Sequence, residues 1–99
     1  DSIKKINNEY PNILVAHNPP YKTKTDKIKY IKHVGSKAIK EFIEKHSLFA
    51  CFCGHVHESH AIDYVNNTSI INPGAFRSGR YATISIEENT INPELHQLN

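Results

Sequence analysis

Two short apolar runs, each followed within two residues by a histidine, limit the folds open to this chain more than any other feature. The first run covers residues 13–16 and the second covers residues 48–53. Continuous apolar runs of this length are typical of strands buried on both faces of a sheet. The first stops at a His-Asn-Pro-Pro segment beginning with His17, because proline cannot continue a hydrogen-bonded ladder. The second stops at a Gly-His-Val-His segment beginning with Gly54.

A helix is predicted between the two runs. Ser36 is a suitable N-cap, and apolar side chains then recur on one helical face at residues 38, 39, 42 and 43. Strand, helix and strand in this order predict a βαβ unit with parallel pairing. We interpret residues 21–34, which precede the helix, as a loop with room for one helical turn, and residues 2–8 as a short helix.

Three strand-like segments follow the Gly-His-Val-His segment, at residues 61–65, 68–71 and 81–87. Asn66 and Asn67 separate the first two segments, and they predict a hairpin because asparagine tolerates positive φ. We expect these strands to extend the βαβ unit in antiparallel fashion, and the chain from residue 89 to be a loop or a frayed end. The predicted fold class is therefore α/β (α+β), with a βαβ unit followed by an antiparallel extension.

Length, charge and cysteine content set further bounds. The chain has 99 residues, enough for one small domain, and no apolar run approaches the roughly 20 residues of a membrane-spanning helix. The net charge is +2, divided into +5 over residues 1–50 and −3 over residues 51–99. The basic half either attracts an anionic substrate or is a solvated lysine-rich surface.

The close spacing of Cys51 and Cys53 disfavours a disulfide, so we expect reduced, buried thiols in a cytoplasmic protein.

Three of the seven histidines follow the predicted strands. His17 follows the first, and His55 and His57 follow the second. In open α/β sheets, sites form outside the carboxyl ends of the strands, so parallel neighbours would bring these imidazoles to one rim. Imidazole is the commonest metal ligand. We expect Gly54 to bend the backbone so that the two later histidines each hold one of two metals.

Other interpretations of these residues compete with a two-metal site. A histidine that follows a strand is often only a polar loop residue, which applies to His17 taken alone. A single zinc site of two cysteines and two histidines is excluded by geometry. Four alternate residues of one strand span about 20 Å, whereas zinc ligands lie about 2.0–2.3 Å from one ion. The residues of that excluded site are Cys51, Cys53, His55 and His57. The remaining histidines are interpreted as exposed or helix-end residues: His33, His46, His60 and His96.

The order of these segments resembles the second half of the calcineurin-like metallophosphoesterases, especially small bacterial and archaeal phosphoesterases. The likeness covers residues 12–86 and includes an Asn-Pro-Gly segment that begins at Asn72. It implies half of an αββα sandwich and a site for two divalent metal ions, commonly manganese, iron or zinc. It further implies that His17 and His55 ligate one metal and His57 the other, while a metal-bridging hydroxide attacks a phosphomonoester or phosphodiester.

Basic side chains offer candidate contacts to the substrate phosphate. Arg77 and Arg80 follow the Asn-Pro-Gly segment, and a guanidinium fork can bind phosphate oxygens in pairs. Four lysines follow the His17 segment and either attract phosphate or are solvated loop residues: Lys22, Lys24, Lys27 and Lys29.

The chain departs from the family pattern in its acidic motifs. No Gly precedes an Asp or Asn, and no Asp is followed two residues later by His. The expected bridging carboxylate, Asn ligand and general-acid His are therefore absent, and no catalytic residue is assigned. Since the chain also lacks Met, we expect residues 1–99 to be the C-terminal portion of a single domain whose N-terminal half is missing, and to be inactive alone.

The expected partners follow from this incompleteness. A half-sandwich would expose an apolar sheet face, so we expect contact with the missing half and self-association of the isolated chain. We expect no membrane partner. One alternative is a binding or scaffold subunit with a degenerate metal site. Another is a nucleic-acid-processing member of the family, which the lysines permit but no pattern of stacking aromatics supports.

Overall fold

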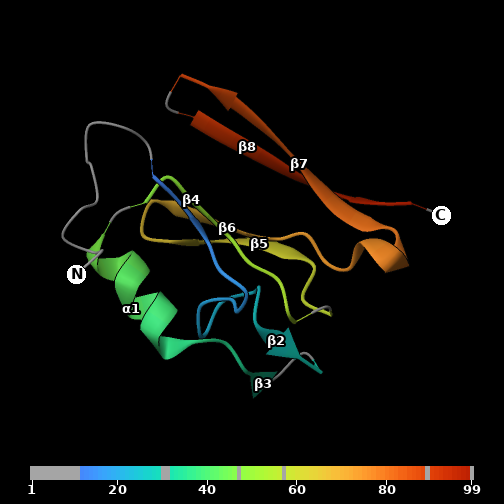
Figure 1. Cartoon of the computed structure of the whole chain (residues 1–99), viewed down its shortest axis with the longest axis horizontal. Coiled ribbons are helices and arrows are strands. Elements are labelled where there is room, and N and C mark those ends of the chain that lie inside the picture. Colours follow the sequence, from blue (N-terminus) through green and yellow to red (C-terminus); the bar gives the residue numbers. More distant parts are fainter. Residues whose placement is uncertain (1–11, 30–31, 47, 57, 89, 99) are drawn as a thin grey trace.

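A four-stranded sheet built from distant segments lies at the centre of the molecule (Figure 1). The computed structural model describes residues 12–29, 32–46, 48–56, 58–88 and 90–98, so the helix predicted at residues 2–8 lies outside the described residues. The strand order is β1-β4-β6-β5, with β1 at Ile13–Val15, β4 at Ala50–Phe52, β6 at Thr68–Asn72 and β5 at Ala61–Val65. The other elements are helix α1 (Lys37–Lys45), β2 (Lys27–Ile28), β3 (Lys32–His33), the 3-10 turn η2 (Phe76–Ser78), β7 (Arg80–Glu87) and β8 (Thr90–Gln97). No helix in the described ranges is long and apolar enough to cross a membrane.

The predicted βαβ unit is confirmed. β1 and β4 pair in parallel with Leu14 opposite Cys51, and α1 lies between them in the chain. Ser36 Oγ accepts a hydrogen bond from the Ile39 amide at 3.1 Å, which caps α1 as expected. The helix buries Ile43 completely in the main apolar core. The other buried members of that core are Leu48, Cys51, Cys53, Val65 and Ile70.

The outer edge of the sheet contradicts the prediction that the first strand is buried on both faces. β1 is an edge strand, and its Ile13 and Val15 side chains are 45% and 76% exposed. Leu14 points to the opposite face and packs against the core cluster. An apolar run of this length does not by itself reveal whether one or both of its faces are covered.

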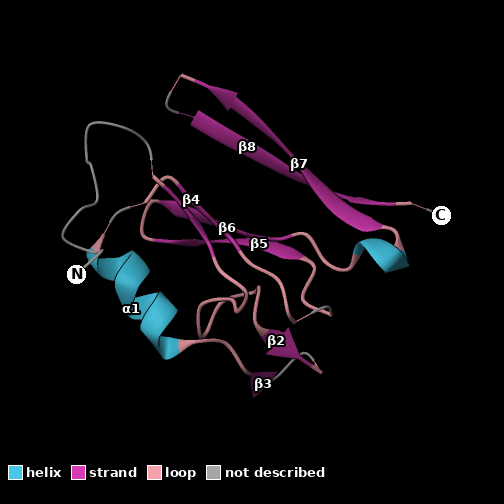
Figure 2. Ribbon diagram, in the orientation of Figure 1, coloured by secondary structure: helices cyan, strands magenta, loops and turns pink. Residues whose placement is uncertain are grey.

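The second half of the chain adds both parallel and antiparallel strands, whereas the sequence predicts only antiparallel ones. β5 and β6 form the predicted hairpin through Asn66, whose φ is 53°. β6 also pairs in parallel with β4, which places it inside the sheet, and all five of its residues are buried. β7 does not join the sheet but pairs with β8 in a separate hairpin, and Figure 2 shows this hairpin and α1 on opposite sides of the central strands.

The C-terminal hairpin corrects the expectation of a loop or frayed end. β8 pairs with β7 along its whole length, and the His96 ring stacks on Tyr81 with centroids 4.9 Å apart. His96 Nε2 also lies 2.7 Å from Thr83 Oγ1, so this histidine is not simply exposed. Half-buried residues alternate with exposed ones in β8, but Pro93 masks that pattern in the sequence, although proline is tolerated in an edge strand.

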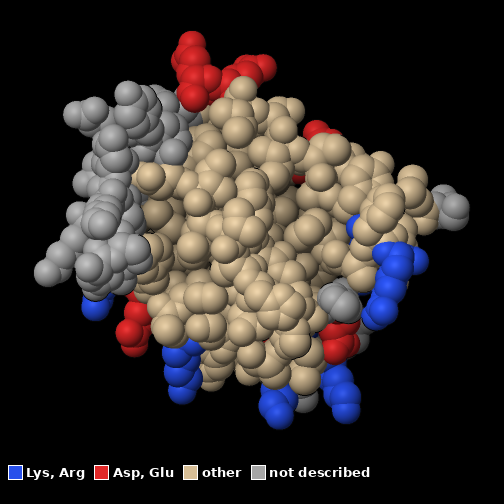
Figure 3. Space-filling view, viewed as in Figure 1, with Lys and Arg blue, Asp and Glu red and all other residues tan. Residues whose placement is uncertain are grey.

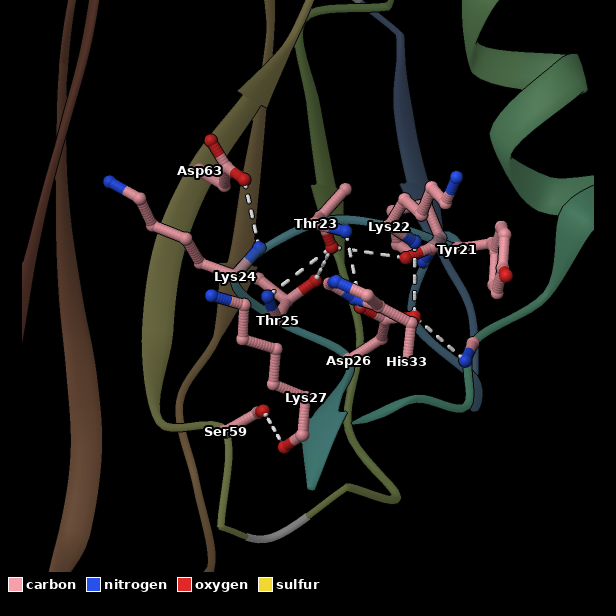
Figure 4. Close-up of polar contacts among 12 residues, drawn as sticks. Tyr21, Lys22, Thr23, Lys24, Thr25, Asp26, Lys27, His33, Ser59 and Asp63 are labelled. Atoms are coloured by element: carbon pink, nitrogen blue, oxygen red, sulfur yellow. Dashed lines mark hydrogen bonds and ion pairs between the residues drawn. The ribbon is translucent and has the colours of Figure 1, made fainter. Parts of the chain in front are cut away.

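A buried aspartate organises the segment between β1 and α1 (Figure 4). Asp26 is fully buried, and its carboxylate accepts hydrogen bonds from the backbone amides of Lys22, Thr23 and Gly35 at 2.9–3.1 Å. His33 Nδ1 lies 2.5 Å from the same carboxylate, so His33 has a structural contact instead of the expected exposed position. The described part of this segment forms the short β2–β3 ladder in place of the expected helical turn.

Candidate metal centre

The two described histidines at the strand ends meet at one rim of the sheet. His17 follows β1 and His55 follows β4, and His17 Nε2 lies 3.0 Å from His55 Nδ1. Their ring centroids are 4.7 Å apart and the ring planes are tilted by 54°. Backbone pairing continues past the strands, since the Gly54 amide donates to the His17 carbonyl at 3.1 Å. The parallel ladder therefore brings the two imidazoles together, as the sequence predicts.

The bend in the second segment lies at His55 and not at Gly54. His55 has a φ of 62°, in the left-handed region that non-glycine residues seldom adopt, whereas the positive-φ glycines of the described chain are Gly74 and Gly79. A Cβ added to Gly54 would meet the His17 carbonyl oxygen at 3.9 Å, which is ordinary contact. The expectation that Gly54 supplies the bend is therefore wrong, and the unusual backbone conformation belongs to the candidate ligand itself.

Asn72 anchors the turn that carries His55. Its side chain is 1% exposed, and its amide donates to the Val56 carbonyl at 2.9 Å and to the Thr25 carbonyl at 3.1 Å. Its Oδ1 accepts a hydrogen bond from the Gly74 amide at 3.0 Å. Sequence reasoning treats Asn-Pro-Gly only as a sharp turn and misses this role. The available signal was an asparagine at the carboxyl end of an apolar strand, beside the two histidine segments.

The likeness to known proteins extends over nearly the whole chain. The sequence model of the family described as "Metallophosphoesterase, calcineurin superfamily" matches residues 2–96. The chain belongs to this family. The uncharacterized protein MJ1162 of Methanocaldococcus jannaschii is 43% identical over 75 residues, which is 72% of this chain and 33% of that protein.

Two solved structures share the fold of this chain. One crystal structure superposes with a TM-score of 0.68 at 25% identity, over 93% of this chain and 36% of that chain. The crystal structure of TT1561 of Thermus thermophilus gives a TM-score of 0.61 at 17% identity, over 87% of this chain and 35% of its own. The chain therefore spans about a third of the length of the relatives it matches. Its mixed α+β architecture, as predicted, is a partial metallophosphoesterase fold.

The spacing of the two described histidines suits a shared metal ion. Nitrogens bound at about 2.0–2.1 Å to one ion lie about 2.8–3.4 Å apart for octahedral to tetrahedral angles. The 3.0 Å between His17 Nε2 and His55 Nδ1 falls in this range, although it equally permits a direct hydrogen bond between the rings. His57 lies outside the described residues, and no group of three potential ligands gathers among those that are described.

Cys51 and Cys53 are free and buried, as predicted. The Cys53 thiol donates to the Ile71 carbonyl at 3.6 Å. Its hydrogen bond with Cys51, together with burial, raises the pKa of Cys53, so the thiol stays protonated. The same hydrogen bond lowers the pKa of Cys51. Since a metal ligand must be the thiolate, the raised pKa disfavours Cys53 as a zinc ligand.

The two arginines that follow the Asn-Pro-Gly segment differ in their exposure and contacts. Arg77 is exposed on η2, whereas Arg80 begins β7, is partly buried, and donates from Nε to Gln97 Oε1 at 3.3 Å. Arg80 also lines a hollow with three lysines of the segment between β1 and α1. Figure 3 shows Lys and Arg side chains gathered along the lower and right-hand edges of the molecule. The two arginines therefore lie in different surroundings, and Arg80 has the more enclosed position.

Proposed function

We propose that this chain contributes the histidine ligands of a dimetal phosphoesterase site. In this proposal His17 and His55 hold one divalent ion and His57 holds the second, with manganese, iron or zinc as the metal. When bound, two such ions supply charge neutralisation and an activated water for hydrolysis of a phosphomonoester or phosphodiester. The observation that carries the proposal is the 3.0 Å separation of the His17 and His55 ring nitrogens at the carboxyl rim of two parallel strands.

The chain's own residues hold this rim in place. Asn72 fixes the His55 turn through its bonds to Val56 and Thr25, and the Gly54 amide ties the turn to His17. Neutral imidazoles suit such a site because each presents an unprotonated nitrogen as ligand while the other ring nitrogen remains free to donate. Rigid positioning of ligands limits the reorganisation that metal binding requires.

We further propose that the carboxylate ligands and the general acid come from sequence outside these 99 residues. Asp26 is fully buried and already accepts several backbone hydrogen bonds, and Asp63 accepts from the Lys24 and Tyr64 amides. The motifs that would supply the remaining ligands are not in the sequence. The isolated chain is therefore expected to be inactive.

The exposed side of β1 is the proposed contact surface for those missing residues. Val15 lines a hollow that also includes His17, Phe52 and Gly54, so one covering segment would close the apolar edge and complete the metal site together. In the isolated chain, a second copy would cover this surface instead. The free, buried cysteines support a cytoplasmic location for the protein.

The alternative function is that of a binding or scaffold subunit with a degenerate metal site. It is favoured by the hydrogen-bonding distance between the two imidazoles, because a direct ring-to-ring bond needs no metal. The two functions differ in what happens to metal affinity when either histidine is removed.

The deciding experiment assays hydrolysis of a generic phosphodiester with added manganese. We expect no turnover by the 99-residue chain and measurable turnover by a longer protein that contains it. In the longer protein, His55→Ala should abolish the activity, whereas His46→Ala at the end of α1 should retain it. Robust turnover by the isolated chain would contradict the proposal that essential ligands lie elsewhere. A folded, metal-loaded longer protein without turnover on any phosphoester would favour the scaffold function.

A further inference from the structure

A basic hollow lies beside the turn that precedes β5. It has a volume of about 240 Å³ and is lined by residues from the β2 region, the turn before β5 and the start of β7. Its charged and polar lining consists of Lys24, Lys27, Lys29, Glu58, Ser59, His60 and Arg80. Four permanent cations therefore face a single carboxylate among the described lining residues, and the hollow favours an anion.

The backbone under these lysines is fixed. The buried Ser59 hydroxyl donates to the Lys27 carbonyl, and the Lys24 amide donates to Asp63 Oδ2 at 2.8 Å. Figure 4 shows the side chains of Lys24 and Lys27 extending to the same side of the segment, away from the Asp26 network. Because the backbone is already ordered, a ligand has to immobilise only the ends of the lysine side chains.

His60 supplies an independent sign of a ligand. Its Nε2 atom is buried and has no hydrogen-bond partner among the described residues. Buried polar atoms are nearly always paired, and none of the described residues pairs with this one, which leaves it available to a ligand. Gly74 makes room for this arrangement, because a Cβ there would lie 2.9 Å from Arg80 Cβ and 3.2 Å from His60 Cδ2.

We infer that this hollow binds a phosphate group. Lysine ammonium groups act as point charges toward phosphate oxygens, arginine adds fixed donors, and the His60 ring adds one more in the tautomer that carries its hydrogen on Nε2. Glu58 lines both this hollow and the one beside His55, so the two are neighbours. If the proposed function holds, the hollow receives a phosphate group other than the one that reacts, and the substrate carries at least two phosphate groups.

The test is a titration of the metal-free chain with inorganic phosphate, followed by amide NMR. Metal is removed with a chelating resin, so the result does not depend on the proposed metal site. We expect shifts at the amides of residues 59–61, and dissociation constants raised about tenfold by Lys27→Ala and by Arg80→Gln, each of which removes a charge-assisted contact. His60→Phe, which keeps the ring but not the nitrogen, should also weaken binding.

Two control variants make the titration decisive. Lys32→Ala removes an exposed lysine on β3 that does not line the hollow, and it should leave phosphate affinity unchanged. His55→Ala should also leave it unchanged, which separates this site from the histidine pair. Phosphate binding that is absent in the wild type, insensitive to Lys27→Ala and Arg80→Gln, or lost in His55→Ala would overturn the inference.

Discussion

His17 Nε2 and His55 Nδ1 lie 3.0 Å apart although 38 positions separate them in the sequence. The parallel pairing of β1 with β4 creates this contact, because it places the ends of both strands at the same rim. The Gly54 amide extends the pairing to the His17 carbonyl. Changes that displace one strand end relative to the other should therefore alter the histidine pair.

Replacement of Asn72 tests how the His55 turn is held. Asn72→Ala leaves the buried Val56 and Thr25 carbonyls without their donor, and we expect it to lower the free energy of unfolding by about 2–4 kcal/mol in urea titration. The matched control, Asn92→Ala, removes an exposed asparagine of β8 and should change stability by less than about 0.5 kcal/mol. Equal stabilities for the two variants would show that Asn72 does not anchor the turn.

Two glycines give a paired test of the backbone geometry. A Cβ on Gly35 would lie 2.5 Å from the Pro19 carbonyl oxygen and 2.8 Å from Asp26 Oδ2, so Gly35→Ala should cost more than about 2 kcal/mol of stability. Gly54→Ala meets only ordinary contact and should cost no more than about 0.5 kcal/mol. Thermal or denaturant unfolding of both variants decides the matter. The reverse order would mean that the bend depends on Gly54 after all.

The sequence predicts the βαβ unit, the Ser36 cap and the β5–β6 hairpin because each depends on local pattern. It also predicts the meeting of His17 and His55, since parallel strand ends share a rim. It does not reveal the Asp26 network or the Asn72 anchor, because their partners lie in other segments and a lone Asp or Asn resembles a loop residue. Exposure of Val15 is hidden for the same reason: burial depends on what packs on the sheet, not on the strand's own composition.

Substitution of Val15 tests the proposed contact surface. Its side chain is 76% exposed on the edge strand, and we expect the isolated chain to self-associate through this surface at high concentration. Val15→Lys places a charge there and should shift the sedimentation profile to the monomer. Ile86→Lys, at a 53% exposed apolar position on β7, serves as the control and should leave association unchanged. A wild-type chain that stays monomeric throughout would argue against the proposed surface.

Metal binding by the histidine pair is the most direct test of the central claim. Calorimetric titration with zinc or manganese compares the wild-type chain with His17→Ala, His55→Ala and the helix-end control His46→Ala. We predict that each of the first two weakens metal affinity by about tenfold or more and that the control binds like the wild type. Affinity for metal that is the same in His55→Ala as in the wild type would contradict the assignment of His17 and His55 as ligands of one ion.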